Sequence, residues 1–144
     1  MRLQISSQLA IFAIIELAAH PERQLTVGEI GAKYGASNHH LAKIMHILGR
    51  AGLVRSIRGV GGGYQFSGNA RRTTLLDVIE LFEDLSPASV GQASSGSGTA
   101  EGRALHLVLG EIDDATRATL GSITLDTLCA LAAREGARAA AREP

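Results

Sequence analysis

The chain has 144 residues, 45% of them hydrophobic, and a formal net charge of zero at pH 7. This length predicts one compact domain, or a small domain with an appended element. The sequence has no run of 18 apolar residues, so a membrane span is not expected, and the first twenty residues lack the cleavage site of a signal peptide. A lone cysteine, Cys129, excludes an internal disulfide and favours the reducing cytoplasm.

The zero net charge conceals an uneven distribution. Residues 1–72 carry nine Lys and Arg against three Asp and Glu, whereas residues 73–144 carry five against eleven. A basic half beside an acidic half is typical of a protein in which one end meets an anionic polymer such as nucleic acid. Charge segregated on an ordinary solvated surface is the alternative at this point.

Three helices are predicted at the start of the chain. Apolar residues recur at helical spacing over residues 4–20, and Pro21 ends this helix. Thr26, with Glu29 three residues later, has the capping-box pattern that starts a second helix, which stops near Gly35. The third helix begins almost at once. Two short helices joined by so tight a turn are typical of a helix-turn-helix.

The third helix has an apolar side and a polar side. Ser37 is its predicted N-cap, and Gly49 and Gly52 mark its end. The apolar stripe consists of Leu41, Ile44, Met45 and Leu48. The opposite side carries hydrogen-bond donors and no carboxylate: Asn38, His39, Lys43, His46 and Arg50. This pattern suits a helix that reads nucleic acid, although a plain solvated face has a similar composition.

The segment RSIRGVGGGYQF, residues 55–66, raises two alternatives. A phosphate-binding loop needs its glycines to lead into a helix, with a third glycine or a Lys-Ser/Thr pair at a set position. Here Tyr64 replaces that glycine, and alternating polarity over 53–57 and 63–67 predicts two strands. A glycine-tipped hairpin, or wing, is therefore favoured, with Arg55 and Arg58 carrying positive charge to a groove of DNA.

Residues 74–84 form the fourth predicted helix. Its acidic residues have the spacing of an exposed helix face, with no His or Cys close in sequence: Asp77, Glu80, Glu83 and Asp84. A solvated face is therefore favoured over a catalytic carboxylate cluster. No Ser/His/Asp arrangement has positional support, so the sequence predicts that the chain is not an enzyme.

The last third of the chain predicts a loop and two helices. Residues 86–102, SPASVGQASSGSGTAEG, are rich in Ser and Gly and predict a mobile loop. A long helix follows from Arg103 to about Gly121, and a shorter, alanine-rich helix begins near Ser122. A long helix outside the core of a small domain needs an apolar partner, most simply its own copy in a homodimer.

Four segments together resemble the Rrf-two family of bacterial winged-helix repressors. They are MRLQISSQLAIFAIIELA, LTVGEIGAKYGASNHHLAKIMHILGRAGLV, SIRGVGGGYQF and TTLLDVIELFE. The likeness is dense over residues 1–84 and weaker over 103–135. It implies a mainly α fold with a small β-wing, a winged helix-turn-helix plus a long C-terminal dimerisation helix. The implied parts are a DNA-binding domain over 1–84, a flexible Ser/Gly-rich loop over 85–102 at the family's sensor position, and dimerisation and C-terminal helices over 103–144.

The resemblance also implies what the chain does. Members of the family are homodimeric, sequence-specific transcription regulators that read two-fold symmetric operators in double-stranded DNA, and repression is the expected mode. The helix that begins at Ser37 matches the family's recognition helix, and Arg58 matches the wing arginine that enters the minor groove. The candidate DNA-binding residues are Ser37, Asn38, His39, Lys43, Arg50, Arg55, Arg58, Gly61 and Tyr64.

The sensor region departs from the family pattern. Cluster-binding relatives carry three cysteines before the long helix, whereas residues 85–105 contain none, and Gln8 stands where some relatives have an acidic ligand. An intrinsic iron–sulfur cluster is therefore not expected, and no other cofactor or metal is predicted. Two alternatives remain open. The C-terminal half responds to a regulatory protein, a small ligand or a thiol change, or the chain is a cluster-binding regulator whose cysteines were removed by engineering.

Overall fold

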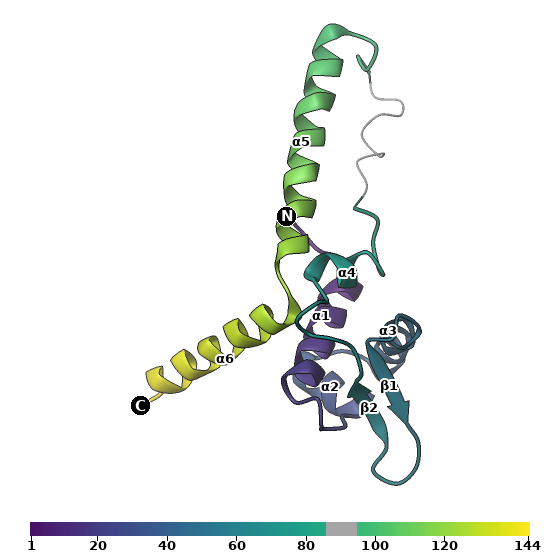
Figure 1. Ribbon diagram of the computed structural model, residues 1–144, viewed down its shortest axis with the longest axis vertical. Coiled ribbons are helices and arrows are strands. Elements are labelled where there is room, and N and C mark those ends of the chain that lie inside the picture. Colours follow the sequence, from purple (N-terminus) through teal and green to yellow (C-terminus); the bar gives the residue numbers. More distant parts are fainter. Residues whose placement is uncertain (86–94) are drawn as a thin grey trace.

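The computed structural model describes residues 1–85 and 95–144, and the described part is mainly helical with one small sheet (Figure 1). In chain order the elements are α1 (Ile5–Ala19), α2 (Val27–Tyr34), α3 (Asn38–Arg50), β1 (Val54–Ile57), β2 (Gly63–Phe66), α4 (Leu75–Ile79), α5 (Ala100–Ser122) and α6 (Leu125–Arg142). The predicted order of helices and strands is confirmed.

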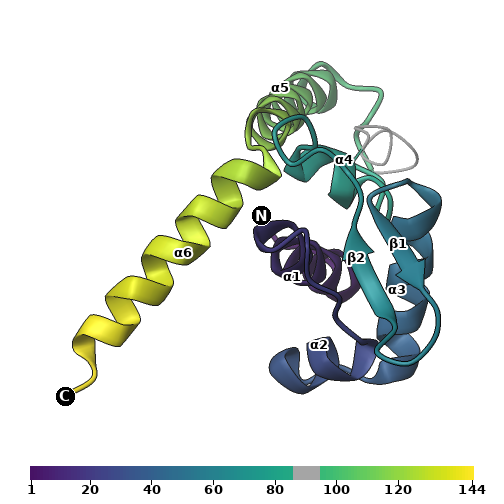
Figure 2. The same cartoon turned by 60° about the horizontal axis from the view of Figure 1, so that its bottom comes forward.

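Helix α1 lies at the centre of the folded part and contacts α2, α3, α4, α6 and β2 (Figure 2). Seven of the fifteen residues of α1 are buried, because the helix is apolar on nearly every face. The buried core side chains from the other elements are Ile30, Leu41, Ile44, Met45, Leu48, Val54, Val78, Ile79 and Leu125. The apolar stripe predicted for the third helix is therefore confirmed as core.

Helices α2 and α3 form the predicted helix-turn-helix, and local chemistry fixes both ends of the turn. The Thr26 hydroxyl accepts a hydrogen bond from the backbone N–H of Glu29 and starts α2. Gly35, in the left-handed conformation at φ +66°, ends α2. The Ser37 hydroxyl then accepts from the N–H of His40 at 3.2 Å and starts α3.

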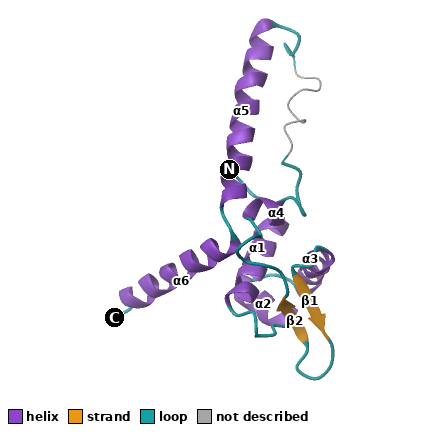
Figure 3. Ribbon diagram, viewed as in Figure 1, coloured by secondary structure: helices purple, strands orange, loops and turns teal. Residues whose placement is uncertain are grey.

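Strands β1 and β2 pair antiparallel, with Arg55 opposite Gln65 and Ser56 opposite Tyr64 (Figure 3). The base of this hairpin is tied to the connection before α2. Tyr64 exchanges two backbone hydrogen bonds with Leu25, of 3.0 and 2.8 Å. The wing is therefore fixed to the helical core at its base, while its tip extends away from the core (Figure 1).

The fourth helix is shorter than predicted. Helix α4 ends at Ile79 rather than near residue 84, and the next residues form turns. The acidic residues of this segment are exposed, as expected for a solvated face, except for Glu83, and they also make specific contacts. Asp77 closes a capping box with Thr74, and the Glu80 carboxylate accepts from Arg117 of α5 at 2.5 Å. Glu83 is half-buried and accepts from the Ser7 hydroxyl at 2.5 Å.

Two long helices extend from the core in different directions (Figure 1). Helix α5 begins at Ala100, earlier than predicted, because the Thr99 hydroxyl caps it by accepting from the N–H of Gly102. The loop expected over 85–102 therefore loses its last three residues to α5, and its residues 86–94 lie outside the described part. The link from α5 to α6 is anchored where Thr74 and Thr124 form an antiparallel bridge and Leu125 enters the core.

Candidate DNA interface

Helix α3 turns a continuous polar face to solvent. His39, Lys43, His46 and Arg50 are exposed and follow one another at intervals of four, three and four residues, which places them on one face of the helix. No Asp or Glu occurs anywhere in α3. The face therefore offers donors and positive charge without a carboxylate that would repel phosphate.

The start of α3 presents two further candidates, and both also have a structural role. Ser37 is exposed, but its hydroxyl caps the helix. Asn38 is exposed and lies against α2, since a Cβ built on Gly31 would be 3.3 Å from the Asn38 Oδ1. The helix N-terminus, with its partial positive charge, is thus placed at the surface beside the exposed face of α3.

The wing carries Arg55 on a strand and Arg58 at the tip. Arg55 donates from Nε and Nη2 to the Oε1 of Gln65, at 3.2 and 2.8 Å. Gln65 in turn donates to the backbone carbonyl of Pro21 at 2.9 Å, so that the guanidinium of Arg55 is oriented by a chain of hydrogen bonds to the exposed turn after α1. Arg58 is exposed beyond the end of β1.

Gly61 and Tyr64 serve the shape of the wing. Gly61 adopts φ +75° in the turn at the tip, a conformation that favours glycine. Tyr64 is half-buried against the hydrophobic core, and its backbone holds the bridge to Leu25. Of the nine candidate residues, seven are therefore exposed side chains or caps on α3 and the wing, one shapes the tip and one anchors the base.

Sequence reasoning missed three sets of long-range polar contacts, of which the first and the third involve α3 or the wing. The hydroxyl of Ser6 and the Nε2 of His40 are 3.0 Å apart, which ties the start of α1 to the first turn of α3. Glu83 accepts from the N–H of Gln4 and from the buried hydroxyl of Ser7. Gln65 carries the third contact, described above. The two residues of each pair are separated by 34 to 79 residues in the chain, so no local sequence pattern predicts these contacts.

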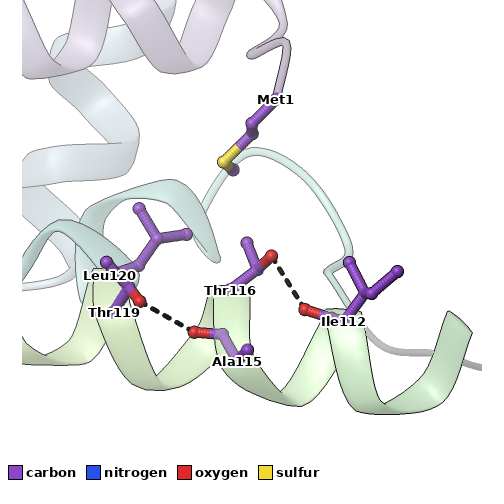
Figure 4. A pocket seen from close by; sticks show the side chains of 6 residues that line it. All are labelled: Met1, Ile112, Ala115, Thr116, Thr119 and Leu120. Carbon is purple, nitrogen blue, oxygen red and sulfur yellow. Dashed lines mark hydrogen bonds between the residues drawn. The ribbon is translucent and has the colours of Figure 1, made fainter. Parts of the chain in front are cut away.

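Helix α5 has an apolar stripe that the single chain leaves uncovered. No residue of α5 is buried, and Leu105, Val108 and Ile112 are 60%, 50% and 55% exposed. The stripe continues into an open hollow of about 370 Å³ beside Met1, lined by Met1, Ile112, Ala115, Thr116, Thr119 and Leu120 (Figure 4). The hydroxyls of Thr116 and Thr119 donate to carbonyls of their own helix, so this hollow presents mainly methyl groups.

The potential metal ligands of the described residues are not grouped. Within residues 1–85 and 95–144 no three His, Cys, Asp or Glu side chains are grouped so that they could hold a metal ion. Cys129 is half-buried on α6, with its sulfur 3.8 Å from the carbonyl oxygen of Ile15. Burial, together with the negative charge of Asp126, raises the pKa of the Cys129 thiol. In the same described ranges no helix is both long and apolar enough to cross a membrane.

The sequence and the fold both match known transcription regulators. Residues 3–131 match the model of the Rrf2 family, described as an iron-dependent transcriptional regulator. BadM of Rhodopseudomonas palustris, named as an HTH-type transcriptional regulator, is 48% identical over 128 residues, which cover 89% of this chain and 81% of that protein. The HTH-type transcriptional regulator IscR of Xenorhabdus nematophila is 29% identical over 129 residues, covering 89% of this chain and 79% of that protein.

Two solved structures have the same architecture. CymR, the global cysteine regulator of B. subtilis, superimposes with a TM-score of 0.73 at 27% identity, over 91% of this chain and 98% of that chain. IscR of T. potens gives 0.72 at 25% identity, over 92% and 88%. These similarities confirm the predicted winged-helix fold and the prediction that the chain is not an enzyme, since the matched proteins are transcriptional regulators. The chain belongs to the Rrf2 family of helix-turn-helix transcriptional regulators.

Proposed function

We propose that this chain is a homodimeric, sequence-specific DNA-binding repressor that works without an intrinsic iron–sulfur cluster. The observation that carries the proposal is the surface of α3 and the wing, which is exposed, rich in donors and free of Asp and Glu from Ser37 to Tyr64. Duplex DNA is a dense anionic polymer, and a carboxylate-free surface of this shape is the complement that it requires.

Each candidate residue has a role in this proposal. Asn38, His39 and Lys43 reach base edges in the major groove, where each base pair presents a distinct pattern of donors and acceptors. Lys43, Arg50, Arg55 and the N-terminus of α3 at Ser37 contact phosphates and fix the register of the protein on the duplex. Arg58 enters the minor groove. Gly61 keeps the tip thin, and Tyr64 holds the wing at its base.

The apolar stripe of α5 supports the homodimer. Leu105, Val108 and Ile112 are each at least half exposed. Packing against a second copy of the helix would remove this apolar surface from water, which is favourable. A two-fold symmetric pair of chains then presents two copies of α3 to a two-fold symmetric operator.

The residues present do not fit an iron–sulfur cluster. Such clusters need several thiolates, or imidazoles, at short range, and this chain has one cysteine in 144 residues. That cysteine lies on α6, and its raised pKa disfavours the thiolate that a metal requires. The signal is therefore proposed to be a regulatory protein or a small ligand that acts through the C-terminal half.

In this proposal, residues 1–84 form the DNA-binding unit, and residues 103–144 form the dimerisation and C-terminal helices. The Ser/Gly-rich stretch 85–102 joins the two parts. The uneven charge distribution of the sequence supports it, because the basic half coincides with the DNA-binding unit. Helix α5 contacts α4 directly, and through these contacts a change in the C-terminal helices would reach the DNA-binding unit.

Footprinting on the DNA upstream of the chain's own gene tests the proposal. The wild type is expected to protect a two-fold symmetric site, with an affinity that falls steeply as salt is added. Arg58→Ala should lose about 1–3 kcal/mol of specific binding. Arg142→Ala, which removes an exposed arginine at the far end of α6, should bind like the wild type. Equal binding by wild type and Arg58→Ala would contradict the role of the wing.

A further inference from the structure

The tip of the wing exposes one apolar side chain completely. Val60 has a relative exposure of 111%, the highest among the exposed large hydrophobic residues that the structure describes. Its neighbours are Gly59 on one side and three glycines, residues 61–63, on the other. Between Arg58 and Tyr64, Val60 is therefore the only residue that has a side chain.

The backbone around Val60 forms a hydrogen-bonded turn. The N–H of Gly62 donates to the carbonyl of Gly59 at 3.0 Å and closes a turn with Val60 and Gly61 in its middle. Gly61 has φ +75° at the third position of this turn, as in a type II turn. A Cβ on Gly62 would lie 2.4 Å from the carbonyl oxygen of Ile57, so the chain is tightly packed there. Val60 is consequently projected outward from a narrow and defined tip.

We infer that Val60 is a specificity-determining residue, which enters the DNA minor groove beside Arg58 and selects A·T over G·C base pairs. This inference rests on the proposed DNA-binding function and deepens it. The minor groove of B-DNA is only about 6 Å wide, and a tip that consists of one valine among glycines is thin enough to enter it. Arg58, two residues away and exposed, brings the charge that a negative groove attracts.

The chemistry of the groove floor explains the selection. A·T pairs present only acceptors there, whereas a G·C pair adds the 2-amino donor of guanine. The isopropyl group of Val60 has no acceptor, so contact with G·C would bury that donor without a hydrogen-bond partner, which is costly. Contact with A·T leaves no donor unpaired, and apolar side chains are commonly used against the minor groove.

A single exposed valine on a protein surface is ordinary and by itself needs no explanation. What distinguishes Val60 is its complete exposure in the turn at the tip, on the element proposed to contact the groove. The decisive comparison is therefore Val60→Thr, which keeps the shape of the side chain and replaces one methyl group by a hydroxyl. That hydroxyl can accept a hydrogen bond from the guanine 2-amino group.

The experiment uses the full-length chain and a duplex selected from a random pool by the wild type. Within that duplex, each A·T pair is replaced in turn by 2,6-diaminopurine·T, which adds only the minor-groove amino group. Each G·C pair is replaced in turn by inosine·C, which removes only that group. Affinities are measured for the wild type, Val60→Thr and Val60→Ala, with thermal melts to establish that all three fold equally.

The wild type is expected to lose at least about fivefold in affinity when diaminopurine stands where the wing contacts the duplex, the low end of the cost of one mismatched pair. Val60→Thr should bind the original duplex and the diaminopurine duplex with affinities that differ by less than about twofold. Such a difference is small compared with the cost of one mismatched pair. A wild type that is indifferent to the amino group at every position, or a Val60→Thr variant that keeps the full preference, would overturn the inference. If the wild type selects no duplex at all, the proposed DNA-binding function itself fails, which is a different result.

Discussion

Gly31 is a point of close approach between α2 and the turn and first residues of α3. It is buried on α2, and a Cβ at this position would lie 2.6 Å from the carbonyl oxygen of Ala36 and 3.3 Å from the Leu41 side chain. Backbone cannot move aside as a flexible side chain can. The angle between α2 and α3, and with it the exposure of the polar face of α3, therefore depends on the absence of a side chain at residue 31.

Gly31→Ala is expected to lower the free energy of unfolding by about 1–3 kcal/mol, the usual cost of forcing extra atoms into a packed site. Gly28→Ala is the matched control, on the same helix, because a Cβ there meets its nearest atom at an ordinary 3.7 Å. That control should be neutral or up to about 1 kcal/mol more stable, since alanine favours helix over glycine. Urea denaturation measures both, and equal stability of the two variants would contradict the close approach at Gly31.

At the scale of elements, α1 and α2 are joined by a charged cluster. The Glu16 carboxylate accepts hydrogen bonds from Lys33 and from the Tyr34 hydroxyl, and the rings of Phe12 and Tyr34 stack with centroids 5.0 Å apart. Burial raises the pKa of Glu16, but the hydrogen bonds from Lys33 and Tyr34, together with the charges of Lys33 and His20, outweigh it, so that its pKa lies below the ordinary value. Burial and the Glu16 carboxylate raise the pKa of Tyr34.

The lowered pKa of Glu16 makes the stability of the fold depend on pH. A carboxyl whose pKa is lower in the folded state stabilises the protein above its unfolded pKa of about 4.3, and that stabilisation disappears as the pH falls through the folded pKa. The free energy of unfolding of Glu16→Gln should therefore be about 1 kcal/mol lower than that of the wild type at pH 7, a figure discounted for partial exposure. On acidification, the free energy of unfolding of the variant should fall less than that of the wild type. Glu143→Gln, at the exposed end of α6, is the control. Chemical denaturation between pH 3 and 7 measures both, and parallel pH profiles of Glu16→Gln and wild type would refute the cluster.

The elements that the sequence predicts well are those whose signals are local. Thr26 and Ser37 cap α2 and α3 as expected, because a hydroxyl and the N–H it accepts from are only three residues apart. The end of α4 was predicted too late, because helical periodicity continues beyond Ile79 in the sequence although the chain turns there. The start of α5 at Ala100 was predicted too late, because the cap Thr99 lies inside a stretch whose composition predicts a loop.

The interface itself could be predicted only as a set of residue types on a face. The hydrogen bonds that orient it join residues far apart in the chain, such as Ser6 with His40 and Gln65 with Pro21. Whether a given serine or glutamine makes such a contact depends on the packing of α1 against α3 and the wing. That packing is a property of the whole fold and has no local pattern in the sequence.

At the scale of the whole molecule, α5 lies outside the core, and none of its residues is buried in the single chain. Its apolar stripe is uncovered, while Leu107 on the opposite face of the helix is as exposed as the stripe, at 65%. This gives a matched pair of variants. Val108→Glu places a charge in the proposed contact between two copies, where it would be desolvated, whereas Leu107→Glu places the same charge where solvent remains.

Sedimentation of the full-length chain, alone and with a duplex selected by the wild type, tests the central claim most directly. The wild type and Leu107→Glu are expected to sediment as dimers and to bind the duplex as two chains per site. Val108→Glu is expected to sediment as a monomer, to fold as judged by its thermal melt, and to bind the duplex far more weakly. A wild type that sediments as a monomer, or a Val108→Glu monomer that binds the duplex as tightly as the wild type, would contradict the account.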